Sequence, residues 1–393
     1  MSNNDVDRSE EFRDYSKKER QVIRVLMAAH VGYPWGGIST FYQDLLGCDV
    51  PDFVELRFID NMDGARIAHL GMKNIANVTR GIRHVWKFIR SLSMFRPNVV
   101  HISTAGGSSL FKQSLMVLFA RAMNVPVVIA PHFSYRRLFS SSSLWNWYVK
   151  RVLSLCQGFH FVSTEWLDLL KGMNSVPYAV FPNPINLKAF ASIDRSGFAS
   201  EDQVVKFLFL GHIGAPKGAF DLIRAAALLA KSGFRERFRI SLYGEEMRPG
   251  VRDEAKNLAH ALGLSDAVVF YDPIFGEDKL KALRHSNAYI LPSHSEGLPV
   301  SIIEAMASGL AVIACNVGGI PDLIRDGYSG LLVPSNDPEK LARSMARLIE
   351  NKKARDAMGL RGRSHVLAHH NIHVSASNFW KFHATVASSG RVA

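Results

Sequence analysis

The chain alternates short apolar runs with longer stretches of helical periodicity along almost its whole length. VIRVLMAA (22–29) and AVIACN (311–316) are typical of these runs, which are largely apolar. Strands of a parallel sheet have this pattern because helices cover both faces of the sheet. The repeated β-α units therefore predict α/β domains. The strand-like runs lie at 22–29, 54–59, 98–103, 125–130, 158–163, 205–211, 239–244, 267–272, 288–291, 311–316 and 330–335.

Two such domains are expected, because 393 residues exceed what one ordinary core holds. A Pro-Asn-Pro cluster at 182–184 and a polar stretch at 191–205 interrupt the alternation and mark a domain boundary. We expect two Rossmann-like β/α/β domains that face each other across a cleft. The predicted segments are a mobile leader (1–20), an N-terminal domain (21–185), a linker (186–204), a C-terminal domain (205–365), and a helical segment (366–393) that packs back on the N-terminal domain.

The stretch SHSEGLPVSIIEAMASG (293–309) is the most informative about chemistry. Pro299 suits the first position of a helix, and Gly309 suits the residue after its end. Glu304 falls in the apolar part of that helix, where burying a carboxylate is costly unless something hydrogen-bonds it. With Glu296 on the other side of the helix start, the pattern suits a sugar nucleotide, whose hydroxyl groups bind the acids. Its diphosphate would bind the unpaired N–H groups of Leu298, Val300 and Ser301.

Composition limits the partners and the compartment. The formal net charge of +12 indicates an anionic partner, such as nucleic acid, an anionic membrane surface or a phosphate-rich substrate. The three cysteines are far apart and form no C-x-x-C, which favours a reducing compartment and no thiolate zinc site. The first twenty residues are polar, and no apolar run approaches the length of a membrane span. We therefore expect a cytoplasmic protein.

The chain resembles the retaining glycosyltransferases of family 4, which have the GT-B fold. The resemblance depends mainly on FLGHIGAPKGAFDLIRA, on SEGLPVSIIEAMASGLAVIACNVGGIPDLIRDGYSGLLV and on the spacing between them. It extends in weaker form to Gly36-Gly37, PNVVHIS, Pro131-His132 and FPNPIN. It implies that the N-terminal domain binds an acceptor and that the C-terminal domain binds a nucleotide-sugar donor, a UDP- or GDP-sugar.

The resemblance also implies roles for the acidic and basic residues of the donor domain. Glu304 matches the glutamate that binds the ribose hydroxyls, and Glu296 matches the one that lies at the donor sugar. Lys217 matches the lysine that neutralises the diphosphate and so lowers the barrier electrostatically. The loop at 297–301, which includes Gly297, should present N–H groups to the phosphate and the sugar.

Further matches lie at the N-terminal glycines and at two histidines. Gly36 and Gly37 match the glycine loop that faces the diphosphate and the acceptor, and His132 matches a histidine near the reacting centre. His212 is a departure, because the family usually has an arginine at that position. Histidine neither grips phosphate bidentately nor stays charged at pH 7. Either Lys217 carries more of the load here, or activity depends on protonation of His212.

The activity that the resemblance implies is transfer of a sugar from a nucleotide diphosphate to a glycan or lipid-linked acceptor with retained anomeric configuration. We expect no metal requirement, because helix N–H groups and Lys217 can hold the charge, and the sequence has no D-x-D motif. Two alternatives remain open, a sugar-nucleotide epimerase of the same fold and a basic nucleic-acid-binding protein. Peripheral binding to an anionic membrane is also expected. The basic residues that would provide it are Arg80, Arg83, Lys87, Arg90, Arg136, Arg137, Lys150 and Arg151.

Overall fold

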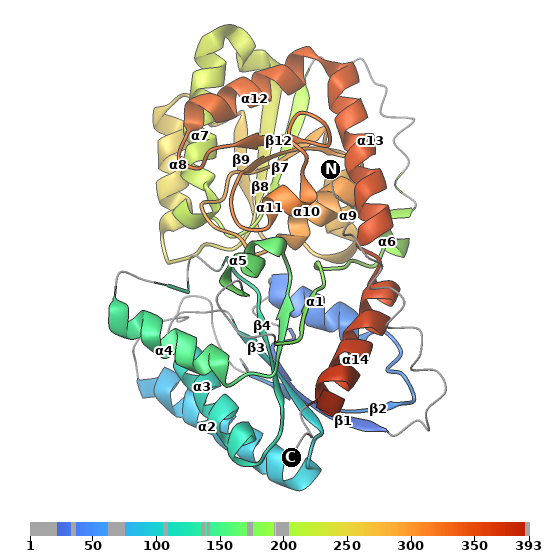
Figure 1. Ribbon diagram of the computed structural model, residues 1–393. Helices are drawn as coiled ribbons and strands as arrows, with labels where there is room; N and C mark the ends of the chain where they lie inside the picture. Colours follow the sequence, from blue (N-terminus) through green and yellow to red (C-terminus); the bar gives the residue numbers. More distant parts are fainter. Residues whose placement is uncertain are drawn as a thin grey trace.

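The computed structural model describes residues 22–32, 37–61, 75–104, 109–134, 138–139, 142–170, 176–191, 193 and 204–389. These residues form two α/β domains stacked end to end, each built on a parallel sheet with helices on both sides (Figure 1). The prediction of two Rossmann-like domains is confirmed. Gly36, Arg136, Arg137 and the leader at 1–20 lie outside the described residues.

The N-terminal sheet has the strand order β2-β1-β3-β4-β5-β6, and all of its pairings are parallel. Its central strands β3 and β4 are buried at every position, as expected for a parallel sheet that helices cover on both faces, and β4 is apolar throughout. The strands are β1 (Ile23–Ala29), β2 (Val54–Asp60), β3 (Val99–Thr104), β4 (Val127–Pro131), β5 (Gly158–Phe161) and β6 (Tyr178–Val180).

The C-terminal sheet has the order β12-β11-β10-β7-β8-β9 and is also parallel. The direction of strand addition reverses between β7 and β10. Ligands of such sheets bind beyond the carboxyl ends of the strands at this reversal. The strands are β7 (Val205–Leu210), β8 (Phe238–Tyr243), β9 (Val268–Tyr271), β10 (Ala288–Leu291), β11 (Ala311–Cys315) and β12 (Leu331–Val333).

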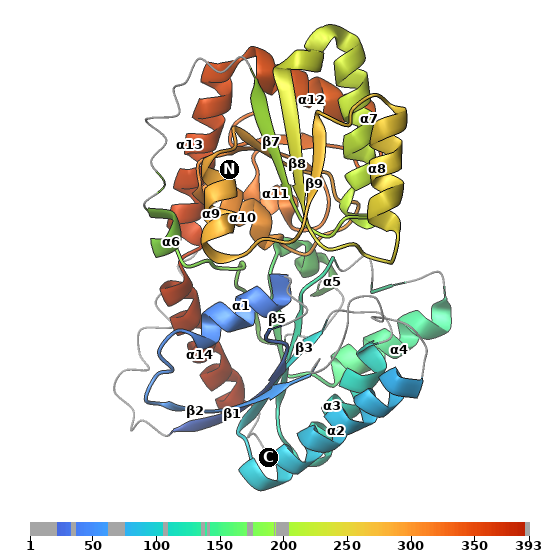
Figure 2. The same ribbon diagram turned by 180° about the vertical axis from the view of Figure 1, so that it is seen from behind.

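Helices connect the strands and cover both faces of each sheet (Figure 2). None of the described helices is long and apolar enough to cross a membrane. The helices are α1 (Gly37–Leu46), α2 (Ile75–Phe95), α3 (Ser109–Ala122), α4 (Ser143–Ser154), α5 (Leu167–Leu170), α6 (Lys188–Ala191), α7 (Ala219–Leu229), α8 (Val251–Ala261), α9 (Gly276–Arg284), α10 (Val300–Ala307), α11 (Ile320–Leu323), α12 (Pro338–Glu350), α13 (Lys352–His369) and α14 (Ile372–Ser389).

The chain crosses between the domains twice on the same side of the molecule (Figure 1). The first crossing follows β6, and the second runs from α13, which packs on the C-terminal sheet, into α14, which packs on β1 and β3. The two crossings are bonded to each other, because Ile185 N–H donates to the carbonyl of His370 over 3.0 Å. His370 Nδ1 in turn donates to the carbonyl of Asn183 over 2.8 Å.

One helix boundary differs from the sequence expectation. Pro299 precedes α10 as its N-cap, with φ −73° and ψ 117°, and the helix begins at Val300. The extended conformation of Pro299 leaves its carbonyl free to accept from Ile302 N–H at 3.1 Å. The helix therefore starts one residue later than predicted.

Candidate active site

A cavity of about 500 Å³ lies between the two domains, in the size range of a small-molecule site. The carboxyl ends of β7, β8 and β10 and the start of α10 form the wall that belongs to the C-terminal domain, as expected for the strand-order reversal. The start of α1 and the residue after β4 form the opposite wall. The predicted site residues that line it are Gly37, His132, His212, Lys217, Glu296, Gly297, Leu298, Val300, Ser301 and Glu304.

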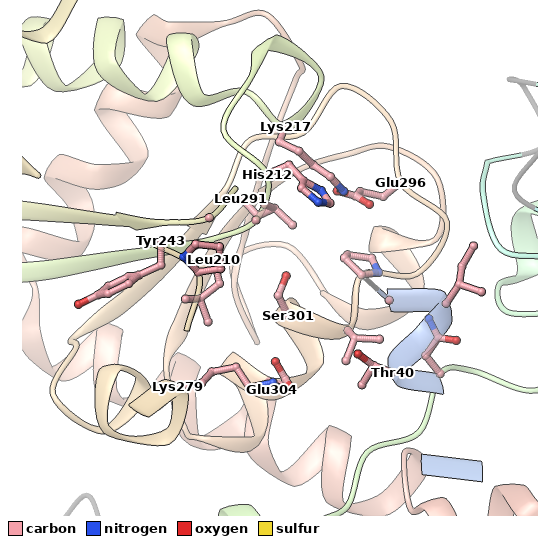
Figure 3. Close-up of a pocket in the computed structure, with 18 of the residues that line it drawn as sticks. Thr40, Leu210, His212, Lys217, Tyr243, Lys279, Leu291, Glu296, Ser301 and Glu304 are labelled. Atoms are coloured by element: carbon pink, nitrogen blue, oxygen red, sulfur yellow. Dashed lines mark hydrogen bonds and ion pairs between the residues drawn. The ribbon is translucent and has the colours of Figure 1, made fainter. Parts of the chain in front are cut away.

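The start of α10 points into this cavity. Among the described residues, the backbone N–H groups of Leu298, Val300 and Ser301 have no backbone acceptor. An unpaired helix N-terminus carries partial positive charge and binds anions. The side chain of Ser301 lies at the centre of the site, between two Lys–Glu pairs (Figure 3).

The first pair joins Lys217 and Glu296. Lys217 Nζ donates to Glu296 Oε1 over 2.6 Å, and Glu296 is only 8% exposed. Lys217 ends a short 3₁₀ turn and is followed by Gly218, whose φ of 74° requires glycine. A Cβ at Gly218 would also collide with the backbone of Pro292. The turn is therefore seated on the end of β10 and directs Lys217 toward the acid.

The second pair was not predicted. Lys279 of α9 donates to Glu304 of α10 over 2.5 Å, and Glu304 is 7% exposed. This contact explains how a carboxylate is tolerated in an apolar helix, because its charge is hydrogen-bonded and neutralised. Burial, together with the negative charge of Glu304, raises the pKa of Asp44 of α1 to about 6, although Lys279 opposes the shift.

His212 follows β7 and lines the cavity beside Lys217 (Figure 3). Burial and the positive charge of Lys217 lower the pKa of His212, and Glu245 and Glu296 only partly oppose this. The imidazole is therefore neutral at pH 7 in the free protein. Of these two side chains, Lys217 is therefore the cation on this side of the cavity.

The N-terminal wall contributes Gly37, Thr40 and His132. Burial lowers the pKa of His132 to about 3, so this imidazole is neutral as well. Its backbone contacts the C-terminal domain closely, since a Cβ on Gly297 would lie 2.7 Å from the carbonyl oxygen of His132. Glycine at 297 thus permits the two walls of the cavity to touch.

Polar contacts fix the two domains on either side of this point. Asn183 Nδ2 donates to the carbonyl of Leu298 over 2.6 Å. On α11, Asp322 accepts from the backbone N–H of Thr164 at 2.6 Å and from its hydroxyl at 2.7 Å. The walls of the cavity are therefore held by contacts specific to this arrangement of the domains.

Several lining residues were missed by reasoning from sequence. They include Lys279 and a group of residues beyond the ends of β8 and β9. The rule that ligands bind beyond the carboxyl ends of parallel strands could have identified that group. Tyr243, in that group, stacks on Tyr271 with ring centroids 4.6 Å apart. Within the described residues, no group of three or more His, Cys, Asp or Glu side chains is placed to hold a metal ion. The missed residues include Thr40, Tyr243, Gly244, Glu245 and Lys279.

Two family models match the chain. Residues 192–365 match the model described as glycosyl transferases group 1, and residues 48–189 match the one described as glycosyltransferase family 4. The D-inositol 3-phosphate glycosyltransferase of Thermobifida fusca is 32% identical over 196 residues, which are 47% of this chain and 44% of that protein. The enzyme of the same name from Acidothermus cellulolyticus is 36% identical over 147 residues, 36% of this chain and 33% of that protein. The chain thus spans less than half the length of these curated relatives.

Solved structures share the fold over nearly the whole chain. Sucrose-phosphate synthase from Thermosynechococcus elongatus superposes with a TM-score of 0.73 and 17% identity, covering 93% of this chain and 100% of that one. Anabaena HepE in complex with UDP-glucose gives a TM-score of 0.70 and 15% identity over 93% of this chain and 100% of that one. At these identities the likeness concerns the fold alone.

Proposed function

Because the chain belongs to the group 1 glycosyltransferases of family 4, we propose that it transfers a sugar from a nucleotide-diphosphate sugar to a glycan or lipid-linked acceptor, with retained anomeric configuration. The observation that carries this proposal is the arrangement around α10. Two buried carboxylates, each paired with a lysine, flank a helix N-terminus that faces an interdomain cavity. Such a site matches a ligand with a central dianion and hydroxyl groups at both ends.

In this proposal the donor lies along α10. The diphosphate accepts from the N–H groups of Val300 and Ser301 and faces Lys217, the ribose hydroxyls bind Glu304, and the transferred sugar lies at Glu296. The base then lies beyond the ends of β8 and β9. Tyr243 and the segment 273–275 line the cavity there and provide apolar surface for it. UDP is a reasonable first probe, since HepE has been solved with UDP-glucose.

The chemistry proposed is front-face transfer. The bond between the anomeric carbon and the leaving phosphate oxygen breaks, and the acceptor hydroxyl oxygen bonds to the same face of that carbon. The hydroxyl proton goes to the departing phosphate oxygen. Lys217 and the α10 N–H groups stabilise the charge that grows on that phosphate. Since these groups already supply positive charge, we expect transfer to continue in the presence of EDTA.

Glu296→Gln separates catalysis from binding. We expect turnover to fall about 100-fold, the range seen when one polar group of a transition-state site is removed, while nucleotide affinity changes little. Glu339→Gln on the exposed face of α12 is the matched control and should leave both unchanged. Assays with a panel of UDP-, GDP- and ADP-sugars would follow transfer and, without acceptor, isomerisation of the donor. Isomerised sugar nucleotide in place of transfer would indicate an epimerase.

A second part of the proposal concerns the membrane. Helices α2, α3 and α4 lie side by side on the outer flank of the N-terminal domain in both views (Figures 1 and 2). Phe111 of α3 packs against Trp145 and Tyr148 of α4, and α2 packs on α3. This flank exposes a concentration of large apolar side chains, which here is called the apolar flank. Its members are Val78, Ile82, Trp86, Met94, Phe111, Leu115, Leu118, Phe119, Met123, Leu144 and Trp147.

Basic residues accompany the apolar flank. Arg83 and Arg90 on α2 and Lys150 and Arg151 on α4 are exposed, and the Arg90 guanidinium lies 5.6 Å from the Trp86 ring centroid. A large exposed apolar patch marks a surface that interacts with a protein or a membrane, and interspersed Lys and Arg favour an anionic bilayer. This supports peripheral attachment at the inner face of the cytoplasmic membrane, where a lipid-linked acceptor would be within reach.

Vesicle flotation tests the membrane part. The parent chain should float with vesicles that contain anionic lipid, more weakly with zwitterionic ones, and less at high salt. Ile82→Asp should abolish flotation, whereas Leu360→Asp on α13 should not, although the two side chains are similarly exposed at 64% and 59%. Equal flotation of both variants would contradict a specific role for the apolar flank.

A further inference from the structure

A buried polar cluster lies behind the N-terminal wall of the cavity. It contains His101 on β3, His132 just after β4, Tyr42 on α1 and His383 on α14. Tyr42, His101 and His383 have no exposed surface, whereas His132 lines the cavity. Three elements of the N-terminal domain and the C-terminal helix thus bring their polar side chains to one point.

These side chains form one continuous hydrogen-bonded series. His383 Nδ1 lies 2.7 Å from the carbonyl oxygen of Phe379, and His383 Nε2 lies 2.9 Å from His101 Nδ1. His101 Nε2 lies 2.7 Å from the Tyr42 hydroxyl, which lies 3.0 Å from His132 Nε2. His132 Nδ1 is buried and has no partner among the described residues. The series therefore begins at a backbone carbonyl and ends at a ring nitrogen of a cavity residue.

All three imidazoles in the series are neutral. Burial lowers the pKa of His383 to about 4 and that of His132 to about 3. Burial, with the neighbouring histidines, lowers the pKa of His101 well below its usual range. Each ring therefore carries one proton and can donate only one hydrogen bond.

The carbonyl of Phe379 then determines the direction of every bond. A carbonyl only accepts, so the proton of His383 is on Nδ1 and its Nε2 accepts from His101 Nδ1–H. His101 has no second proton, so its Nε2 accepts from the Tyr42 hydroxyl. The Tyr42 proton is thereby used, and its oxygen accepts from His132 Nε2–H. No other assignment satisfies all four contacts with neutral rings.

We propose that Tyr42, His101 and His383 are positioning residues that hold His132 as the Nε2–H tautomer, so that its Nδ1 keeps a lone pair for a hydroxyl group of the ligand. The nature of that ligand, the transferred sugar or the acceptor, rests on the proposed function. The tautomer itself does not, because it follows from the free protein. His132 acts in this proposal as a hydrogen-bond acceptor and not as a proton carrier.

The direct test is ¹⁵N NMR of the imidazole nitrogens in the free protein, because a protonated and an unprotonated ring nitrogen have distinct shifts. The parent chain should show His132 with a protonated Nε2 and a bare Nδ1. Tyr42→Phe removes the acceptor of Nε2–H and should produce a second population protonated at Nδ1. Ile349→Val, a buried change on α12 in the other domain, is the control and should leave the His132 signals unchanged. A His132 protonated at Nδ1 in the parent chain would overturn the proposal.

Kinetics supply the functional readout. Tyr42→Phe should lower kcat about tenfold, the effect of one hydrogen bond, with the KM for the donor nearly constant. His132→Asn retains an oxygen near the place of Nδ1, whereas His132→Gln does not, so the Asn variant should be the more active. Equal loss in both would contradict the role of Nδ1. If the parent has the Nε2–H tautomer but no donor supports transfer, the proposed function fails and the assignment of the tautomer stands.

Discussion

Lys279 Nζ lies 2.5 Å from Glu304 Oε1, so a carboxylate buried in an apolar helix is neutralised by a cation from another helix. The pair joins α9 to α10 and forms one end of the cavity. Its lysine side chain is 25% exposed and its glutamate side chain 9%, so the glutamate has lost most of its hydration. Removing one partner of a half-buried pair destabilises the fold more than removing both, because the remaining charge is left without a partner.

Each single variant should therefore lose more free energy of unfolding than the double variant. Lys279→Met should lower the free energy of unfolding by about 2 kcal/mol, less than for a fully buried pair because solvent reaches the lysine. The double variant Lys279→Met with Glu304→Gln should recover most of this loss, although it should bind nucleotide more weakly than the parent chain. Urea denaturation of the two single variants and the double variant gives the coupling energy between the two side chains. Additive losses would show that the pair contributes no coupling energy.

Gly297→Ala should abolish transfer without unfolding the chain. A Cβ at this position would lie 2.7 Å from the His132 carbonyl oxygen and 3.0 Å from the Phe133 nitrogen, which is closer than real side chains approach. The domains must then move apart, and the two walls no longer meet. Turnover assays would record the loss of transfer, and small-angle X-ray scattering would record the separation of the domains.

The matched control for that change is Gly81→Ala on α2. A Cβ there meets nothing within 4 Å. Alanine is the better helix former, so the variant should be more stable by about 0.5–1 kcal/mol and fully active. Loss of activity in this control would show that replacement of a glycine by alanine has effects beyond contact between the walls.

Asp44→Asn should stabilise the protein at neutral pH. The pKa of Asp44, raised to about 6, means that the fold favours its protonated form. That stability is fully present below the ordinary pKa near 4 and is lost as pH rises through about 6. At pH 7.5 the variant should therefore gain about 1 kcal/mol, a value reduced for solvent screening, and at pH 4 it should gain nothing. Thermal unfolding at both pH values checks this, with exposed Asp49→Asn as the unaffected control.

Donor affinity should increase as pH falls. His212 is neutral in the free protein because burial and Lys217 lower its pKa, and a bound diphosphate would raise that pKa by supplying negative charge. Binding is then coupled to proton uptake as the pH falls through the raised pKa of the bound state. Calorimetry of a sugar nucleotide from pH 5.5 to 8 should show this slope in the parent chain and not in His212→Arg. A slope that persists in the variant would locate the titrating group elsewhere.

The predicted residues that lie within one continuous stretch do line the cavity. Glu296, Glu304 and the α10 N-terminus occur within a few residues of one another, so a local helix rule indicated their chemistry. The α/β fold followed in the same way, because the buried strands are apolar throughout. Pro299 was misplaced by one residue because proline suits both the N-cap and the first turn.

Features that depend on distant contacts could not be predicted. Lys279 and Glu304 are 25 residues apart, and no local pattern in α9 distinguishes Lys279 from Lys281, which pairs with Asp278. The series that leads to His132 draws on four separate segments, and His101 and His383 are separated by 282 positions. A histidine within an apolar strand indicates burial, but its partner depends on the tertiary fold.

The two bonded crossings near Asn183 and His370 have a mechanical consequence. Both connections lie on one side of the molecule, so they form a hinge between the two domains. Separation of the domains must then be greatest at the opposite edge, and it would break the contacts of Asp322 with Thr164 before those at the hinge. Because α14 moves with the N-terminal domain, His383, His101, Tyr42 and His132 would stay together through such a movement. The proton on His132 would therefore already be in place whenever a donor enters the open cleft.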